Sequence, residues 1–247
     1  MRKTWLLMGM PITVEIVDDV PASLFDGVYD HFAAVDRRFS LYRQDSEISA
    51  INRSELAPAD FSSEMREVLA LADRTGVETG GMFDIRRPDG MVDPSGIVKG
   101  WVVFNAALIL ARAGVKNYYV DAGGDIQASG TNQDGQCWRV GIRNPFNEQE
   151  IVKAVSLRDC GIATSGTYAR GQHIYNPNRP MEQIHDIVSL SVIGRDVLEA
   201  DRFATAAFAM GKDGVYFLEA QDGLEGYVIA ANGTATQTTG FGAYAVS

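Results

Sequence analysis

The stretch "VKNYYVDAGGDIQASG", residues 115–130, contains two strand-like segments joined by a pair of glycines. Apolar and β-branched residues between turn residues are typical of strands, and two adjacent glycines are typical of a sharp turn. Similar segments follow at short intervals, namely "CWRVGIRNP" (137–145), "KAVSLRD" (153–159) and "DIVSLSVIG" (186–194). Residues 4–18 and the segment from residue 225 to the end, a closing hairpin, are also predicted to be strands.

Three of the predicted helices lie in the first half of the chain, before the run of strands. Residues 22–42 and 62–76 have apolar residues at helical spacing, and the second of these has a serine/glutamate start signal and a glycine stop. Residues 96–114 are apolar nearly all round, which predicts a buried helix. Because strands and helices occur in runs rather than alternating, we expect an α+β fold with a mainly antiparallel sheet and flanking helices. No linker or repeat divides the chain, so we expect a single domain over residues 1–247.

Composition and charge exclude several classes of protein. The net charge is -10 and no basic stripe is present, which argues against a nucleic-acid partner. The two cysteines lack zinc spacing and favour a reducing compartment. The N-terminus has too few apolar residues before Pro11 for a secretory signal, and no apolar run approaches the roughly 20 residues of a membrane span. We therefore expect a cytoplasmic protein with no membrane span.

The segment "EADRFATAAFAMG", residues 199–211, predicts a buried helix that ends at a glycine. Asp201 and Thr205 lie four residues apart in it, so their oxygens share one helical face. One interpretation is structural: Asp201 caps the helix and Thr205 bonds back to the preceding turn. The other is a hard-cation site, in which a carboxylate, a hydroxyl, a backbone carbonyl and waters bind Mg²⁺.

Four glycine-containing stretches are predicted to be turns, and none matches a dinucleotide or P-loop motif. They are "TGGMFD" (79–84), "DPSGIVKG" (93–100), "DAGGDI" (121–126) and "TSGTYARG" (164–171). Asp93 and Lys99 bracket a helix start near Gly96, where exposed N–H groups suit a phosphate; an aspartate cap and a surface lysine are the alternative. His173 lies in a polar, irregular stretch and is a candidate acid or base.

Taken in order, these motifs make the chain resemble the ApbE family, the FAD:protein FMN transferases or flavin transferases. The resemblance covers nearly the whole chain from Met8 and rests on "MGM", "SLYRQDSEISAIN", "TGGMFDI", "VDPSGIVKGW", "DAGGDI", "WRVGIRNP", "ATSGTYAR", "HIYNP" and the helix at 199–211. It implies a T-fold-like ApbE-type domain with a flavin site in a cleft. It also implies that Mg²⁺ holds the pyrophosphate of the substrate FAD, and that a threonine of a target flavoprotein attacks the FMN phosphorus and releases AMP.

The resemblance also implies roles for individual residues. The metal ligands would be Asp201, Thr205 and the carbonyl of Gly96, and His173 would be the base, with Asp201 also catalytic. The FAD contacts would be Met8, Tyr42, Met82, Phe83, Asp84, Asp93, Lys99, Ser165, Gly166, His173 and Ile174.

Some positions depart from the family pattern. Asn176 replaces a carboxylate, Trp101 a tyrosine and Phe104 an aspartate. The departure at Asn176 keeps open an FAD-binding protein without catalysis. A second alternative is an FAD pyrophosphatase, in which water attacks at the same site and yields FMN and AMP.

Overall fold

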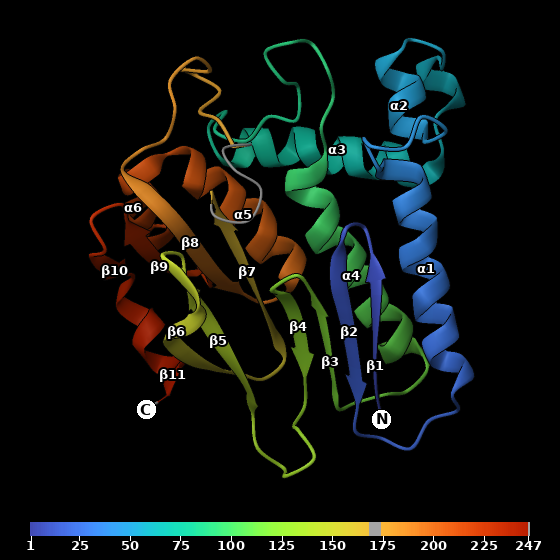
Figure 1. Ribbon diagram of the computed structural model, residues 1–247, viewed down its shortest axis with the longest axis vertical. Helices are drawn as coiled ribbons and strands as arrows, with labels where there is room; N and C mark the ends of the chain where they lie inside the picture. The colour runs from blue at the N-terminus through green and yellow to red at the C-terminus, as the bar shows by residue number, and fades with distance from the viewer. Residues whose placement is uncertain (168–173, 247) are drawn as a thin grey trace.

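The computed structural model describes residues 1–167 and 174–246, and within them two antiparallel sheets are formed. The larger sheet has the strand order β1-β2-β3-β4-β7-β8-β9-β10 and the smaller has the order β11-β6-β5 (Figure 1). The strands of the larger sheet are β1 (Arg2–Leu7), β2 (Met10–Ile16), β3 (Tyr118–Ala122), β4 (Asp125–Ser129), β7 (Cys160–Gly166), β8 (Ile187–Gly194), β9 (Glu225–Ala230) and β10 (Ala235–Gln237). Those of the smaller sheet are β5 (Trp138–Asn144), β6 (Asn147–Leu157) and β11 (Ala245–Val246). The predicted α+β class is confirmed.

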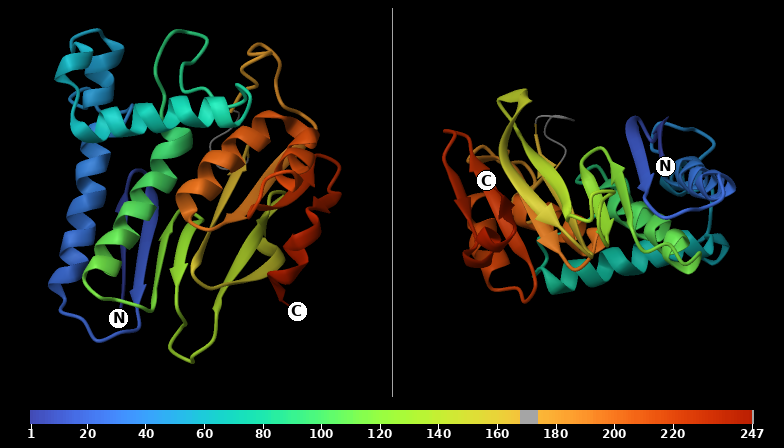
Figure 2. Two further views of the ribbon diagram at one scale, coloured as in Figure 1. Left: turned by 180° about the vertical axis from the view of Figure 1, so that it is seen from behind. Right: turned by 90° about the horizontal axis from the view of Figure 1, so that it is seen from below.

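The long helices lie on one face of the larger sheet, and the β5–β6 hairpin lies on the other (Figures 1 and 2). The helices are α1 (Ser23–Phe39), α2 (Glu47–Asn52), α3 (Ser63–Glu78), α4 (Ser95–Arg112), α5 (Val197–Ala209) and α6 (Gly214–Glu219). Short 3₁₀ turns span Pro58–Asp60, Gly211–Asp213 and Thr239–Ala243. The four segments predicted to be helices around residues 22–42, 62–76, 96–114 and 199–211 are confirmed.

Three apolar clusters hold these layers together. The first packs α1, α3 and α4 on β2 and β3, and includes the fully buried Phe25, Phe32 and Leu110. The second fills the space between the two sheets, and the third packs α5 and α6 on β7, β8 and β9. Helices α4 and α5 contact the strands of the larger sheet directly, and α3 packs on α4.

The prediction that "TSGTYARG" (164–171) is a turn is wrong for its first three residues. Residues 164–166 belong to strand β7. Residues 160–166 pair with β4 on one side and with β8 on the other. A Cβ atom at Gly161 would lie 2.1 Å from the backbone nitrogen of Val197, at the start of α5. Helix α5 therefore lies so close to β7 that the strand must carry small residues, which resemble a turn in the sequence.

The predicted glycine stop of α3 is also wrong. Gly76 lies inside the helix, which continues to Glu78. The Thr79 hydroxyl donates a hydrogen bond to the carbonyl of Thr75 at 2.7 Å, and Gly80 and Gly81 then turn the chain with φ of 61° and 83°. The left-handed conformation that ends a helix is thus adopted by this glycine pair rather than by Gly76.

Helix α4 is apolar over most of its surface. Its 18 residues meet, by length and composition alone, the description of a helix that could cross a membrane, and half of them are buried in the structure. It lies between α1 and α5 and contacts β3 and β4. This burial is typical of a central core helix, and it places the N-terminus of α4 at the upper edge of the sheet (Figure 2).

Candidate active site

Helices α4 and α5 approach closely because glycines of α4 face the polar residues of α5. A Cβ atom at Gly100 would lie 2.6 Å from Cβ of Asp201, and one at Gly96 would lie 2.9 Å from Cγ2 of Thr205. Both pairs are spaced four residues apart on their helices, so the two glycines meet the two polar side chains in register. The glycines thus give Asp201 and Thr205 access to the backbone of the first turns of α4.

The hydrogen bonds of Asp201 and Thr205 run between the helices. The N–H of Gly100 donates to Oδ2 of Asp201 at 2.7 Å, and the Thr205 hydroxyl donates to the carbonyl of Gly96 at 3.1 Å. Ser165 Oγ lies 3.5 Å from Thr205 Oγ1. The structural interpretation from the sequence is therefore wrong at both positions, since Thr205 does not bond back within its own helix.

The residue that caps α5 is Asp196. Its Oδ1 accepts a hydrogen bond from the N–H of Glu199 at 2.8 Å, as an N-cap does. Asp201 lies a full turn further into the helix and is 4% exposed. A carboxylate buried at this position has no role in capping the helix.

Sequence reasoning missed Asp125, which lies beside these residues. It is 1% exposed, its Oδ1 accepts a hydrogen bond from the N–H of Thr164 at 3.1 Å, and Lys99 Nζ lies 2.8 Å from its Oδ2. Within the described part of the chain this Oδ2 receives no hydrogen bond, although Lys99 is at ion-pair distance. In the sequence, Asp125 is the acid that follows the glycine pair of "DAGGDI", a pattern that by itself predicts only a turn.

The two carboxylates make the site electrostatically unusual. Burial raises the pKa of Asp201 well above its usual value, and the nearby carboxylate of Asp125 raises this pKa further. The ammonium of Lys99 and the N–H of Gly100 act in the opposite direction on the same pKa. Two buried carboxylates share the single ammonium of Lys99, so the desolvation of their charges is poorly compensated. A second cation would therefore strongly stabilise the charged form of Asp201.

The donor set fits a hard divalent cation. Asp201, Thr205 and the Gly96 carbonyl supply oxygen atoms, which Mg²⁺ prefers, and Asp125 adds negative charge. Among residues 1–167 and 174–246, no three His, Cys, Asp or Glu side chains are grouped to hold a metal ion. The site would therefore depend on a hydroxyl, a backbone carbonyl and water in addition to carboxylate.

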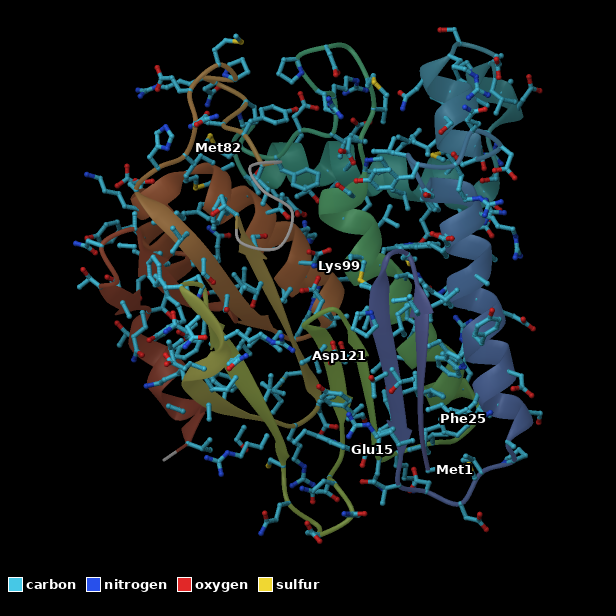
Figure 3. The ribbon with its side chains drawn as sticks, viewed as in Figure 1. Met1, Glu15, Phe25, Met82, Lys99 and Asp121 are labelled. Carbon is cyan, nitrogen blue, oxygen red and sulfur yellow. The ribbon has the colours of Figure 1, made fainter. Side chains whose placement is uncertain are left out.

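A cleft runs over the N-terminus of α4 and brings most of the predicted FAD contacts together. One pocket is lined by the predicted residues Met82, Phe83, Asp84, Asp93, Gly96, Ile174 and Thr205. A second, of about 430 Å³, is lined by Met8, Tyr42, Asp93 and Lys99. Asp93 and Ser95 line both pockets, so the two pockets adjoin each other in this cleft. Lys99 lies where α4, α5 and the β1–β2 turn come together (Figure 3).

The remaining predicted residues lie around this cleft. Ser165 and Gly166 are at the end of β7, with Ser165 buried against Thr205. Asp84 and Asp93 accept hydrogen bonds from the N–H groups of Arg86 and Ser95. Tyr42 is 98% exposed at the mouth of the second pocket. His173 lies outside the described residues.

Tyr175 is a further residue of the cleft that the sequence did not indicate. Its hydroxyl donates a hydrogen bond to the carbonyl of Arg86 at 2.7 Å, which ties the segment after residue 174 to the segment after Asp84. Burial and nearby carboxylates, first among them Asp84, raise the pKa of Tyr175 to about 12. The hydroxyl is therefore protonated at neutral pH and serves as a donor.

The fold and the site together define an α+β protein whose cleft brings Lys99 near the oxygen atoms of Thr205 and of the Gly96 carbonyl. Residues 8–87 and 86–228 match the model of the ApbE family, and the chain belongs to this family. It is 26% identical over 280 residues to the FAD:protein FMN transferase of Escherichia coli (strain K12), covering 88% of this chain and 79% of that protein.

Further relatives agree with this membership. The FAD:protein FMN transferase of Vibrio cholerae serotype O1 is 32% identical over 170 residues, which cover 65% of this chain and 51% of that one. The solved structure of the flavin transferase ApbE from Vibrio cholerae superposes with a TM-score of 0.85 over 99% of this chain and 98% of that one, at 23% identity. At this identity the structural match establishes the shared fold.

Proposed function

We propose that this chain is an FAD:protein FMN transferase that uses Mg²⁺. A threonine hydroxyl oxygen of an acceptor flavoprotein forms a bond to the phosphorus of the FMN half of FAD. The bond from that phosphorus to the oxygen of the AMP phosphate breaks, AMP leaves, and the hydroxyl proton passes to a base. The observation that carries the proposal is the buried Asp201 carboxylate one helical turn from Thr205, which together with Gly96 lines the first pocket of the cleft.

The residues of this pair would hold the cation. Asp201, Thr205 and the Gly96 carbonyl supply the oxygens, and the N–H of Gly100 fixes the orientation of the Asp201 carboxylate. When bound, Mg²⁺ neutralises negative charge on the pyrophosphate, which phosphoryl transfer requires more than covalent help. The N-terminus of α4 adds the positive end of its dipole on the same side of the cleft.

The two pockets would separate the ends of FAD. The larger one is of the size of ordinary ligand pockets and has an apolar wall at Met8, Met10 and Phe39. Tyr42 at its mouth offers an aromatic face to a planar ring. Asp93 lines both pockets, and Lys99 lines the larger one. A dinucleotide could then span both pockets with its phosphates near the cation ligands.

The base in this proposal is His173, which the family resemblance places beside the transferred phosphate. A neutral imidazole near pH 7 can accept the proton of a threonine hydroxyl, and such a base typically contributes about 10²–10⁴-fold to the rate. The polar, irregular stretch around His173 and the family resemblance both support this assignment.

One assay separates the proposal from its alternatives. The chain is incubated with FAD, MgCl₂ and a candidate acceptor flavoprotein, with an acceptor whose threonine is replaced by valine as the control. We expect the acceptor with its threonine, but not the valine control, to gain the mass of FMN less one water, while AMP is released. Release of free FMN and AMP without an acceptor product would instead establish a pyrophosphatase, and intact bound FAD would establish a binding protein.

A further inference from the structure

Two consecutive residues of α4 each hold one of two neighbouring buried carboxylates. Lys99 Nζ lies 2.8 Å from Asp125 Oδ2, and the N–H of Gly100 donates to Asp201 Oδ2 at 2.7 Å. The carboxylates come from different layers, since Asp125 begins β4 and Asp201 is in α5. The ammonium of Lys99 thus contacts Asp125, and the N–H of Gly100 contacts Asp201.

Asp125 is fixed firmly enough to direct Lys99. It is 1% exposed, and its Oδ1 accepts the N–H of Thr164, so it is tied to β7 as well as to its own strand. The Lys99 side chain is 23% exposed and lines the larger pocket. Its ammonium also lies near enough to Asp201 to lower the pKa of that carboxyl. A flexible lysine so close to two carboxylates could pair with either one.

We propose that Asp125 is a positioning residue that holds the Lys99 ammonium away from Asp201, leaving the Asp201 carboxylate available to a divalent cation. This inference rests on the proposed use of Mg²⁺ by the site. If Lys99 paired with Asp201, its single charge would neutralise the carboxylate that the cation requires and would occupy the same space. With Lys99 held by Asp125, the ammonium instead faces the cleft, where it can meet an anion.

A double-mutant cycle on Mg²⁺ binding tests this role without measuring activity. The rise of Tm with MgCl₂ concentration, in the absence of FAD, gives an apparent Kd for the chain and for its Asp125→Asn, Lys99→Met and doubly substituted variants. Asn keeps an oxygen for the Thr164 N–H and loses the charge that holds Lys99. We expect Asp125→Asn to weaken Mg²⁺ binding about tenfold when Lys99 is present, a coupling within the range for residues in contact.

In the Lys99→Met background, we expect Asp125→Asn to weaken Mg²⁺ binding only about twofold, because no ammonium is left to move and only the negative charge of Asp125 is lost. Lys99→Met alone should bind Mg²⁺ at least as tightly as the unmodified chain. The matched control is Asp121→Asn, which removes the other carboxylate of the same turn; Asp121 accepts the N–H of Gly124 at 2.8 Å. Its apparent Kd for Mg²⁺ should match that of the unmodified chain.

An equal loss on Asp125→Asn in both backgrounds would overturn the inference, since Asp125 would then be a cation ligand or a purely structural residue. Weaker Mg²⁺ binding by Lys99→Met would overturn it independently, even if Asp125→Asn failed to fold. If the unmodified chain shows no Mg²⁺-dependent rise in Tm, both the proposed use of Mg²⁺ and this inference are rejected. If the unmodified chain shows a normal Mg²⁺-dependent rise in Tm, but Lys99→Met does not restore Mg²⁺ binding to the Asp125→Asn variant, only the positioning role of Asp125 is rejected.

Discussion

The N–H of Gly100 on α4 donates a 2.7 Å hydrogen bond to Oδ2 of Asp201 on α5, across 101 positions of the sequence. The contact exists only because residue 100 has no side chain, since a Cβ there would lie 2.6 Å from Cβ of Asp201 and 2.9 Å from the carbonyl oxygen of Val197. The same approach joins the two helices and orients the carboxylate proposed to bind Mg²⁺.

Gly100→Ala should therefore destabilise the protein by about 1–3 kcal/mol, the usual cost of overpacking a core. Urea denaturation gives the free energy of unfolding, and the Mg²⁺-dependent rise in Tm should be lost as well. Gly27→Ala in α1 is the matched control because nothing lies within 4 Å of its added Cβ. It should stabilise the protein by about 0.4–1 kcal/mol. Equal effects of the two substitutions would refute the close approach of α4 and α5.

Asp201→Asn should abolish FMN transfer and the Mg²⁺-dependent rise in Tm, while the protein remains folded without Mg²⁺. Asn can still accept the Gly100 N–H, and the change removes a buried charge that is costly to desolvate. The control is Asp196→Ala at the true cap of α5, which should cost about 1 kcal/mol of stability and leave the Mg²⁺ response intact. Near-normal transfer by Asp201→Asn would show that the metal assignment is wrong.

Tyr42→Ala should weaken FAD binding about two- to tenfold, as expected when stacking worth about 0.5–1.5 kcal/mol is lost at a pocket mouth. Fluorescence titration with FAD measures this. The free energy of unfolding should change by no more than about 0.5 kcal/mol, because Tyr42 is 98% exposed. Tyr216→Ala, which removes a 72% exposed tyrosine of α6, should leave FAD affinity unchanged. An unaltered FAD affinity in Tyr42→Ala would exclude its contact with the ligand.

His31 should make the fold sensitive to mild acid. Burial lowers the pKa of His31 below 6.5, and its Nε2 lies 3.1 Å from the carbonyl of Val102. The unfolded chain therefore binds the proton more readily than the folded one, so stability is complete above pH 6.5 and falls as the pH drops below it. His31→Gln should lose less stability than the unmodified chain between pH 7 and 5 in urea denaturation. Parallel losses in both proteins would contradict the buried, neutral histidine.

Much of the local structure followed from the sequence because its causes are local. The apolar spacing of α1, the serine at the start of α3 and the all-round apolar surface of α4 are properties of neighbouring residues, and each predicted its helix. The i, i+4 spacing of Asp201 and Thr205 likewise placed both oxygens on one face before any partner was known. Along one chain these periodicities need no distant contact to be recognised.

Tertiary structure decided what depends on partners distant in the sequence. β7 is built from small residues because α5 lies on it, so "ATSG" carried no strand signal. The closing hairpin expected from residue 225 to the end forms only in part. β10 pairs with β9 as expected, whereas β11 pairs with β6 of the smaller sheet. Asp125 could not be assigned because its meaning depends on Lys99 and Thr164, which come from α4 and β7. Burial and charge pairing arise only when these layers pack. They make Asp125, which the sequence places in a turn, part of the site.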